Sequence, residues 1–360
     1  MYPRRQNMED MGHRACIDAT LRFEKTEKTP FNNFSNIVAV RSAGHVIENA
    51  RFDSKISSES TIRYAKMTKS DFIKPCLDTN VEFLDISVPK KIPLKIPSDN
   101  YIRITDGVIN TPEDVEALEF YDPFDPKTCP NFTKGFVDNI SALANSIDED
   151  WHICGFCWAP FSFAGFLMGA EQLMMDIFVE PDLVKSLIKK TTAMSRALQR
   201  RCVDAGATMM WMADPTAGED LIDSEMYKEF ELDGVKEVIK GVKDFDKDAP
   251  IFLHMCGYTA NTMRMLPDIG VQCFSCDFKT DLAEARESAG RRMAVMGNVN
   301  PVELVMMGTP EQIRENVYDG IRKAGIDGGF IIGPGCEVPR DAPDENVLAM
   351  GQAGIDFWKQ

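Results

Sequence analysis

Short apolar runs alternate with longer amphipathic stretches along most of the chain. The runs have the length and β-branched or aromatic character of buried strands, and the stretches between them have helical spacing. Eight runs qualify as strands: residues 36–42, 81–88, 152–157, 208–214, 251–256, 273–277, 293–298 and 328–333. Strands that alternate with helices predict repeated βα units and a parallel sheet.

Helix starts are marked between these runs. Thr111-Pro112 and Thr309-Pro310 each place a capping hydroxyl before a proline in the first turn, and Glu180-Pro181 opens an amphipathic stretch. The pattern predicts an α/β fold, a single (β/α)8 TIM barrel over residues 1–360. Residues 1–35 form an N-terminal extension. Residues 89–130, rich in Pro and Asp, form an insertion and a candidate lid over the barrel mouth.

Composition and charge narrow the functional classes. The net charge of −16 repels nucleic-acid phosphates and anionic lipids, and no basic stripe offsets it, so a nucleic-acid partner is not expected. No run of 18 uncharged apolar residues is present, and we expect no membrane span. Ten cysteines without an export signal indicate a reducing, cytoplasmic compartment, in which they serve as thiols or ligands.

Polar side chains collect at the ends of the predicted strands. Asp214 ends the fourth run, His254 and Cys256 end the fifth, Asn298 ends the seventh, and Cys336 follows the eighth. Active sites of α/β barrels lie at the carboxyl ends of the strands. We therefore expect these residues around one mouth, with Asp214 and Asn298 as catalytic candidates. Capping of the next helix is the alternative role for Asp214.

His254 and Cys256 are the sharpest candidates for metal ligands. Residues at i and i+2 of a strand face the same side, so both can approach one ion, and Cys336 can reach it from the turn after the eighth run. One His and two Cys with a free fourth position are typical of catalytic zinc. A core histidine with two buried thiols fits the spacing as well. Because all three residues lie at or just after the ends of predicted strands, we favour bound Zn2+ over packing in the core.

Other cysteine pairs and nucleotide motifs do not support a site. Cys154/Cys157 and Cys273/Cys276 have zinc-ribbon spacing, but on strands an i to i+3 spacing points the thiols to opposite faces. Neither a GxGxxG after a strand nor a P-loop is present. The Asp-x-His-x-x-Gly pattern of corrinoid-binding domains occurs once, at residues 150–155, which overlap the third predicted strand, and we expect any corrinoid to be carried by a partner protein.

Several segments resemble the uroporphyrinogen decarboxylase superfamily, and within it the zinc-dependent, corrinoid-linked methyltransferases. They are residues 161–174, 205–224, 297–301 and 333–346. The resemblance implies His254, Cys256 and Cys336 as the zinc set and a corrinoid (cobalamin) on a partner protein. The decarboxylases have Arg-Gln-Ala-Gly-Arg where residues 41–45 read Arg-Ser-Ala-Gly-His. Decarboxylation is therefore the third choice.

The direction of methyl transfer depends on a weaker pattern. Glu9, Glu24 and His45 match the Glu-x14-Glu-x20-His spacing described for methyltransferase I of O-demethylase systems. The resemblance thus implies transfer from a methoxylated, aromatic donor to Co(I), with His45 as a mouth residue and catalytic candidate. The two glutamates precede the first predicted strand and receive no role. The alternative is a methylcobamide:thiol methyltransferase of the coenzyme M type. A homodimer is compatible with either.

Overall fold

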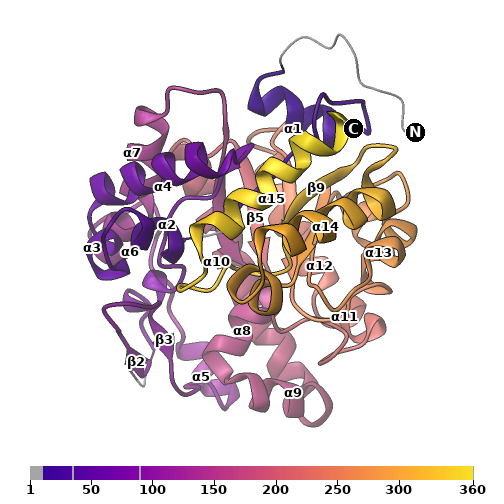
Figure 1. Cartoon of the computed structure of the whole chain (residues 1–360). Coiled ribbons are helices and arrows are strands. Elements are labelled where there is room, and N and C mark those ends of the chain that lie inside the picture. Colours follow the sequence, from indigo (N-terminus) through magenta and orange to yellow (C-terminus); the bar gives the residue numbers. More distant parts are fainter. Residues whose placement is uncertain (1–10, 35, 89–90, 360) are drawn as a thin grey trace.

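The computed structural model describes residues 11–34, 36–88 and 91–359. Its centre is a curled parallel sheet surrounded by helices (Figure 1). Neighbouring strands in this seven-stranded sheet are, in order, β1 (Phe72–Ile73), β4 (His152–Trp158), β5 (Met209–Ala213), β6 (Ile251–Met255), β7 (Cys273–Cys276), β8 (Ala294–Val299) and β9 (Phe330–Pro334). The strands are almost wholly buried, as expected for a parallel sheet covered by helices.

Residues 30–32 join the two edges of this sheet. The Asn32 N–H donates to the Ile332 carbonyl of β9 (2.9 Å), and the Ile332 N–H donates to Pro30 (2.8 Å). On the other side, the Asp71 N–H before β1 donates to Phe31 (2.7 Å). This short segment therefore occupies the eighth strand position, and the predicted α/β TIM-barrel fold is confirmed.

Two of the eight predicted strands are wrong. Residues 36–42 contain the helix α2 (Ile37–Ser42), and residues 81–88 contain the 3-10 turn η1 (Val81–Leu84). Their places are taken by residues 30–32 and by β1. The other six predicted runs coincide with β4 to β9. A short apolar run that is buried on all sides has no distinguishing period, so pattern alone could not separate these helices from strands.

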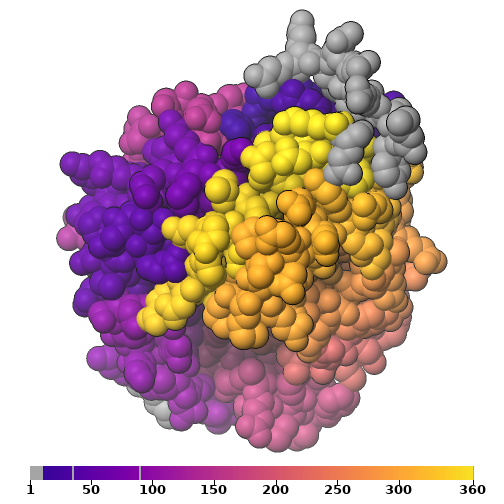
Figure 2. Space-filling view, in the orientation of Figure 1, coloured from indigo at the N-terminus to yellow at the C-terminus, as the bar shows by residue number. Residues whose placement is uncertain are grey.

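The helices follow the strands in the order expected of a barrel. They are α1 (His13–Leu21), α2, α3 (Ile47–Arg51), α4 (Ser54–Thr68), α5 (Pro112–Ala117), α6 (Pro130–Phe132), α7 (Asp138–Ser146), α8 (Pro160–Met168), α9 (Ala170–Val179), α10 (Pro181–Asp204), α11 (Ser224–Phe230), α12 (Leu232–Lys243), α13 (Leu282–Ala289), α14 (Pro310–Gly320) and α15 (Asp344–Asp356). Short 3-10 and π turns are η2 (Thr133–Val137), η3 (Thr262–Arg264), η4 (Leu266–Ile269), η5 (Pro301–Met306), η6 (Ile321–Gly325) and η7 (Phe357–Lys359). In Figure 2, the C-terminal segment that includes α15 lies between N-terminal and orange segments, in agreement with its packing on α4 and α14.

The predicted helix starts are present where the capping residues indicate them. The Thr111 hydroxyl accepts from the Asp114 N–H (3.2 Å) at the start of α5, and the Thr309 hydroxyl accepts from the Gln312 N–H (3.4 Å) at the start of α14. Each hydroxyl satisfies a backbone donor that the first turn leaves without an intrahelical partner.

The elements within residues 91–117 lie at the end of the barrel toward which the strands run. They are the hairpin of β2 (Leu94–Lys95) and β3 (Arg103–Ile104), and also α5. Figure 1 places these elements at the same end of the molecule as α8 and α9, with α1 at the opposite end. The segment therefore contributes to the surroundings of the barrel mouth.

A buried ion pair attaches this segment to the barrel. The Arg51 Nε lies 2.8 Å from a carboxylate oxygen of Asp78, and both side chains are almost fully buried. The same guanidinium donates to the carbonyls of Pro97 (2.9 Å) and Asn100 (3.0 Å), while Asp78 accepts from the Ile102 N–H (3.1 Å). The pair thereby fixes the loop that connects β2 and β3.

Aromatic rings fill the barrel interior below the mouth. Phe72, Trp211 and Phe252 pack against one another with ring centroids 5.4 to 6.1 Å apart. Such pairs add stabilisation beyond the apolar area that they bury. Because the interior is filled at this level, open space remains only above Trp211, toward the carboxyl ends of the strands.

Among the described residues, no single helix has both the length and the apolar character needed to cross a membrane. The pair α8 and α9 meets the composition test only when taken together, and the two helices are bent by 105°. Almost every residue of α8 is buried within the protein.

Candidate metal centre

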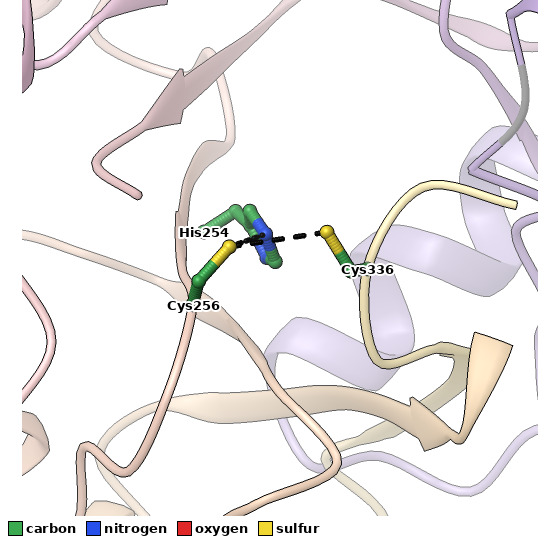
Figure 3. A group of neighbouring side chains, drawn as sticks. All are labelled: His254, Cys256 and Cys336. Atoms are coloured by element: carbon green, nitrogen blue, oxygen red, sulfur yellow. Dashed lines mark hydrogen bonds between the residues drawn. The ribbon is translucent and has the colours of Figure 1, made fainter. Parts of the chain in front are cut away.

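The structure brings His254, Cys256 and Cys336 together. His254 belongs to β6, Cys256 directly follows this strand, and Cys336 follows β9 after one glycine. The Cys256 Sγ lies 3.6 Å from His254 Nε2 and 3.8 Å from Cys336 Sγ. All three ligand atoms lie within 4.8 Å of one another. Figure 3 shows Cys336 facing the other two side chains from a separate segment.

The spacing of these atoms fits a tetrahedral ion. With Zn–S bonds of about 2.3 Å and a Zn–N bond of about 2.0 Å, tetrahedral angles separate two sulfurs by about 3.8 Å and a sulfur from a nitrogen by about 3.6 Å. The Cys256 distances, 3.8 Å to sulfur and 3.6 Å to nitrogen, equal these values. Three protein ligands leave a fourth position open for a substrate, as in catalytic zinc sites.

The orientation of His254 is set by the neighbouring strand. Its Nδ1 lies 3.1 Å from both the carbonyl oxygen and the hydroxyl of Ser275 on β7. A carbonyl oxygen only accepts, so Nδ1 carries the proton and Nε2 presents its lone pair to the cysteines. A second hydrogen bond of this kind holds metal-binding histidines in one tautomer and raises their basicity. Ser275 is a site residue that the sequence analysis missed.

The two thiols share their protons unequally. Hydrogen bonds from Cys256 and His254 lower the pKa of Cys336 to about 4, and the same pairing with Cys336, together with burial, raises the pKa of Cys256. Cys336 is therefore the thiol of the pair that loses its proton more readily. A divalent cation that replaces the thiol protons would bind both sulfurs as thiolates.

A cavity of about 110 Å³ adjoins the three ligands. Four of its twelve lining residues are Phe or Trp, and Lys74 and Glu337 are its two charged lining residues outside the ligand set. The full lining is Phe34, Lys74, Thr79, Phe156, Trp158, Trp211, Ala213, Pro215, His254, Cys256, Cys336 and Glu337. The cavity can therefore hold a flat apolar molecule with one end at the ligand cluster.

Lys74 and Glu337 were missed by the sequence analysis. Lys74 follows the two-residue strand β1, whose shortness hid its position at a strand end. Glu337 follows Cys336, and it accepts hydrogen bonds from the Asn36 N–H (3.3 Å) and from the Tyr101 hydroxyl. The neighbouring Cys336 was the available signal for Glu337. No comparable signal marked Tyr101, which contacts the lining residue Glu337 from the segment held by Arg51.

Asp214 points away from this cavity. Ala213 faces the interior and lines the cavity, so the next residue is directed toward the helices. The Asp214 carboxylate accepts from the Ser162 hydroxyl of α8 (2.6 Å), and Asp214 is fully buried. The structure thus gives Asp214 a contact with a side chain of α8, a helix that precedes it in the chain, whereas the next helix, α11, is capped by Asp223.

Burial gives Asp214 a distinct pH dependence. Desolvation, partly opposed by the Ser162 hydrogen bonds, raises the pKa of Asp214 to about 7. The folded state therefore favours the protonated form, and the associated stability is full below the unfolded pKa of about 4 and lost as pH rises through about 7. Because Asn does not titrate, the Asp214→Asn variant does not lose stability in this way as pH rises. We expect Asp214→Asn to gain free energy of unfolding relative to wild type between pH 5 and pH 8, by on the order of 3 kcal/mol.

Denaturant titrations at the two pH values measure this difference. The matched control is Asp281→Asn, because Lys323 lowers the pKa of Asp281, so this carboxyl stays charged from pH 5 to pH 8 and its replacement should change stability equally at both pH values. A wild-type to Asp214→Asn difference that stays constant from pH 5 to pH 8 would show that Asp214 does not titrate in this range.

Asn298 and His45 also lie apart from the ligands. The Asn298 amide on β8 donates to the backbone carbonyls of Asp277 (3.1 Å) and Thr280 (2.6 Å), and it does not line the cavity. His45 is exposed in the loop between α2 and α3. Neither residue therefore contacts the cluster that His254 and the two cysteines form.

The Glu-x14-Glu-x20-His spacing does not correspond to one site in the described residues. Glu24 is exposed and forms an ion pair with Arg22 (2.9 Å). Its backbone lies against Gly328, which precedes β9 and so belongs to the end of the barrel opposite the mouth. Glu9 lies outside the described residues. The match therefore provides no metal ligand from Glu24.

The barrel and its converging His, Cys and Cys side chains place the chain among α/β-barrel enzymes with polar chemistry at the mouth. Residues 16–355 match the uroporphyrinogen decarboxylase (URO-D) family. The chain therefore belongs to this family, as its motifs indicated.

Its relatives carry out more than one reaction. A uroporphyrinogen decarboxylase from Microcystis aeruginosa is 30% identical over 263 residues, which cover 71% of this chain and 72% of that protein. A methylated-thiol–coenzyme M methyltransferase from Methanosarcina mazei is 26% identical over 310 residues, with coverage of 84% and 77%. Among solved structures, a methyltransferase from Methanosarcina mazei has a TM-score of 0.77 at 19% identity and covers 97% of this chain and 100% of its own. The last likeness shows the fold.

Proposed function

We propose that this protein is a zinc-dependent methyltransferase that exchanges a methyl group with the corrinoid of a partner protein. In the proposed direction, a methoxylated, aromatic compound gives its methyl group to Co(I). The observation that carries the proposal is the cluster of His254, Cys256 and Cys336, whose spacing suits one tetrahedral ion with an open position. Its place beside a cavity lined by aromatic rings supports a substrate bound at that position.

The chain's own residues would bind and orient the ether. Bound Zn2+ would supply a Lewis acid for the ether oxygen. Phe34, Phe156 and Trp211 offer ring faces for an aromatic substrate and exclude water from the reacting bond. The bond between the methyl carbon and oxygen breaks, its electron pair stays on oxygen, and the carbon bonds to the partner's cobalt. Hydrogen bonding to Ser275 keeps His254 in place as negative charge develops.

Methyl transfer to a thiol is the second candidate. The relative from Methanosarcina mazei is named for methylated thiols and coenzyme M, and it aligns with most of this chain. The cavity of about 110 Å³ is also smaller than the roughly 150 Å³ apolar cavity that accepts benzene in an engineered protein, which favours a small substrate. An aromatic ether would therefore need to extend into the open mouth.

Decarboxylation of a tetrapyrrole is the third choice on this geometry. A polycarboxylate would require several cationic partners, but no arginine is among the described residues that line the cavity. Arg41, from the segment that resembles the decarboxylase motif, forms an ion pair with Asp344 instead. A cavity of about 110 Å³ is also far smaller than a tetrapyrrole.

Spectra of the cobalt centre test the direction of transfer. The zinc-loaded protein is mixed with Co(I) corrinoid and methoxylated phenols, and separately with methyl-Co(III) and thiols. We expect conversion of Co(I) to methyl-Co(III) only with the ethers, and loss of this conversion after chelation of zinc. Consumption of methyl-Co(III) by thiols, with no reaction of ethers, would assign the second candidate. Release of carboxyl groups from a tetrapyrrole by metal-free protein would assign the third.

A further inference from the structure

Lys74 places a buried amine in the cavity wall. Its side chain follows β1 and is only 6% exposed. The Nζ lies over the Phe34 ring at 4.5 Å from the centroid, and 5.5 and 5.9 Å from the centroids of Phe156 and Trp211. Aromatic faces attract a cation, but they do not replace the water or counter-ion that a buried charge loses.

No carboxylate among the described residues lies within ion-pair distance, 4.0 Å, of the Lys74 Nζ. Glu337, which acts on Lys74 from farther away, is already bonded to the Asn36 N–H and the Tyr101 hydroxyl. With the Asn36 amide turned so that both its ends find partners, its neutral oxygen accepts from Nζ at 3.3 Å. The Lys74 amine therefore has a neutral acceptor but no direct counter-ion, and burial lowers the pKa of Lys74, so an anion bound beside it favours the charged form.

The ammonium and the ligand cluster border the same cavity. The Phe34 ring separates them: its centroid is 4.5 Å from the Lys74 Nζ and 5.0 Å from the centroid of the His254 ring. Both Lys74 and His254 line the cavity, as does Cys336. A molecule of one ring or a few bonds can therefore contact the ligand cluster at one end and the ammonium at the other.

We propose that Lys74 is an anion subsite, and that the substrate carries a negatively charged oxygen group at the end opposite its methyl-bearing atom. The position of the methyl-bearing end rests on the proposed function. A methoxylated aromatic acid has the required form, because its ring suits the aromatic walls and its carboxylate pairs with Lys74. A sulfonated thiol offers the same anionic chemistry in a smaller molecule. Lys74 thereby selects acidic substrates over neutral ones of equal size.

Binding measurements test the subsite without methyl transfer. Trp158 and Trp211 line the cavity, so their fluorescence reports occupancy of the zinc-loaded protein. The probes are 4-methoxybenzoate against neutral 4-methoxybenzyl alcohol, and 2-mercaptoethanesulfonate against 2-mercaptoethanol. We expect the anion of at least one pair to bind about 10-fold more tightly or better in wild type, as a charge-assisted contact provides. The pair that shows the preference identifies the source of the anion.

Variants assign this preference to Lys74. Lys74→Met keeps the length of the side chain and should bring the affinity ratio of each pair to about one, while Lys74→Arg should retain the preference. The matched control is Lys243→Met, since Lys243 is a half-buried amine that donates to Ala249 (2.7 Å) and Gln272 (3.1 Å), away from the cavity. An unchanged anion preference in Lys74→Met, or equal binding of both members of each pair in wild type, would overturn the proposal.

Stability separates the subsite from a structural role. Removing a buried charge without a direct counter-ion should raise the melting temperature of the ligand-free protein, so we expect Lys74→Met to melt higher than wild type. A structural counter-ion to Glu337 would give the opposite result. Preferential binding of anions without any methyl transfer would leave the subsite standing and remove the proposed function. Methyl transfer with equal affinity for acidic and neutral ethers would support the proposed function and remove the anion subsite.

Discussion

Replacement of Cys336 by serine is expected to remove bound zinc and with it methyl transfer. Only His254 and Cys256 then remain at the distances that suit the ion, and two ligands do not hold Zn2+ against dialysis. Changes around metal ligands already lower affinity about 10- to 100-fold, so loss of a ligand should exceed this range. Metal analysis after dialysis and the cobalt assay measure the two effects. His254→Ala and Cys256→Ser should behave alike.

Cys276→Ser provides the control for this experiment. Cys276 is also a cysteine at the end of a barrel strand, but it is fully buried and its Sγ donates to the Met296 carbonyl (3.5 Å). This variant should keep one zinc per chain and its activity. One equivalent of zinc in Cys336→Ser, or its loss from Cys276→Ser, would show that the ion is held elsewhere.

Replacement of Arg51 by methionine is expected to lower the free energy of unfolding by about 3–5 kcal/mol. The substitution leaves Asp78 buried without its counter-ion and removes the donors to Pro97 and Asn100. Because these carbonyls lie in the loop between β2 and β3, residues 91–104 should also be cleaved faster by protease in the folded protein. Urea titration and limited proteolysis measure the two effects.

The double variant Arg51→Met, Asp78→Asn tests the cause. Removing the carboxylate charge as well should restore part of the lost stability, since the main penalty is the unpaired buried charge. Equal or greater destabilisation of the double variant would instead assign the loss to packing. Tyr101 lies in the attached segment and bonds to Glu337, so the single variant should also weaken binding in the cavity.

The metal cluster was predictable because strand periodicity and barrel topology act together. His254 and Cys256 share a face by their spacing, and Cys336 follows another strand whose carboxyl end opens at the same mouth. The remaining site residues lacked such a pattern. Lys74 follows a strand of two residues, and Tyr101 meets the lining residue Glu337 from a segment far away in the chain. The positions of Lys74 and Tyr101 depend on contacts between segments that are distant in the sequence.

The wrong predictions have similar physical origins. Residues 36–42 are apolar throughout and form α2, because the neighbouring residues 30–32 take the strand position between β9 and β1. Asp214 was placed at the mouth from the end of its run, but the alternation of side chains after Ala213 directs it toward α8. The spacing of Glu24 and His45 carried no information on distance in the fold. A shift of one residue along a strand turns a side chain from the barrel interior toward the surrounding helices.

The ligands of the cluster come from parts of the chain 80 residues apart, β6 and the turn after β9. An ion held by both would join β6 to the turn after β9, in the manner of a reversible cross-link. An unfolded chain cannot assemble these ligands, so folding becomes linked to the free zinc concentration. The melting temperature of this protein should then follow the logarithm of available metal, and starvation for zinc would loosen the last third of the barrel before it affects the rest.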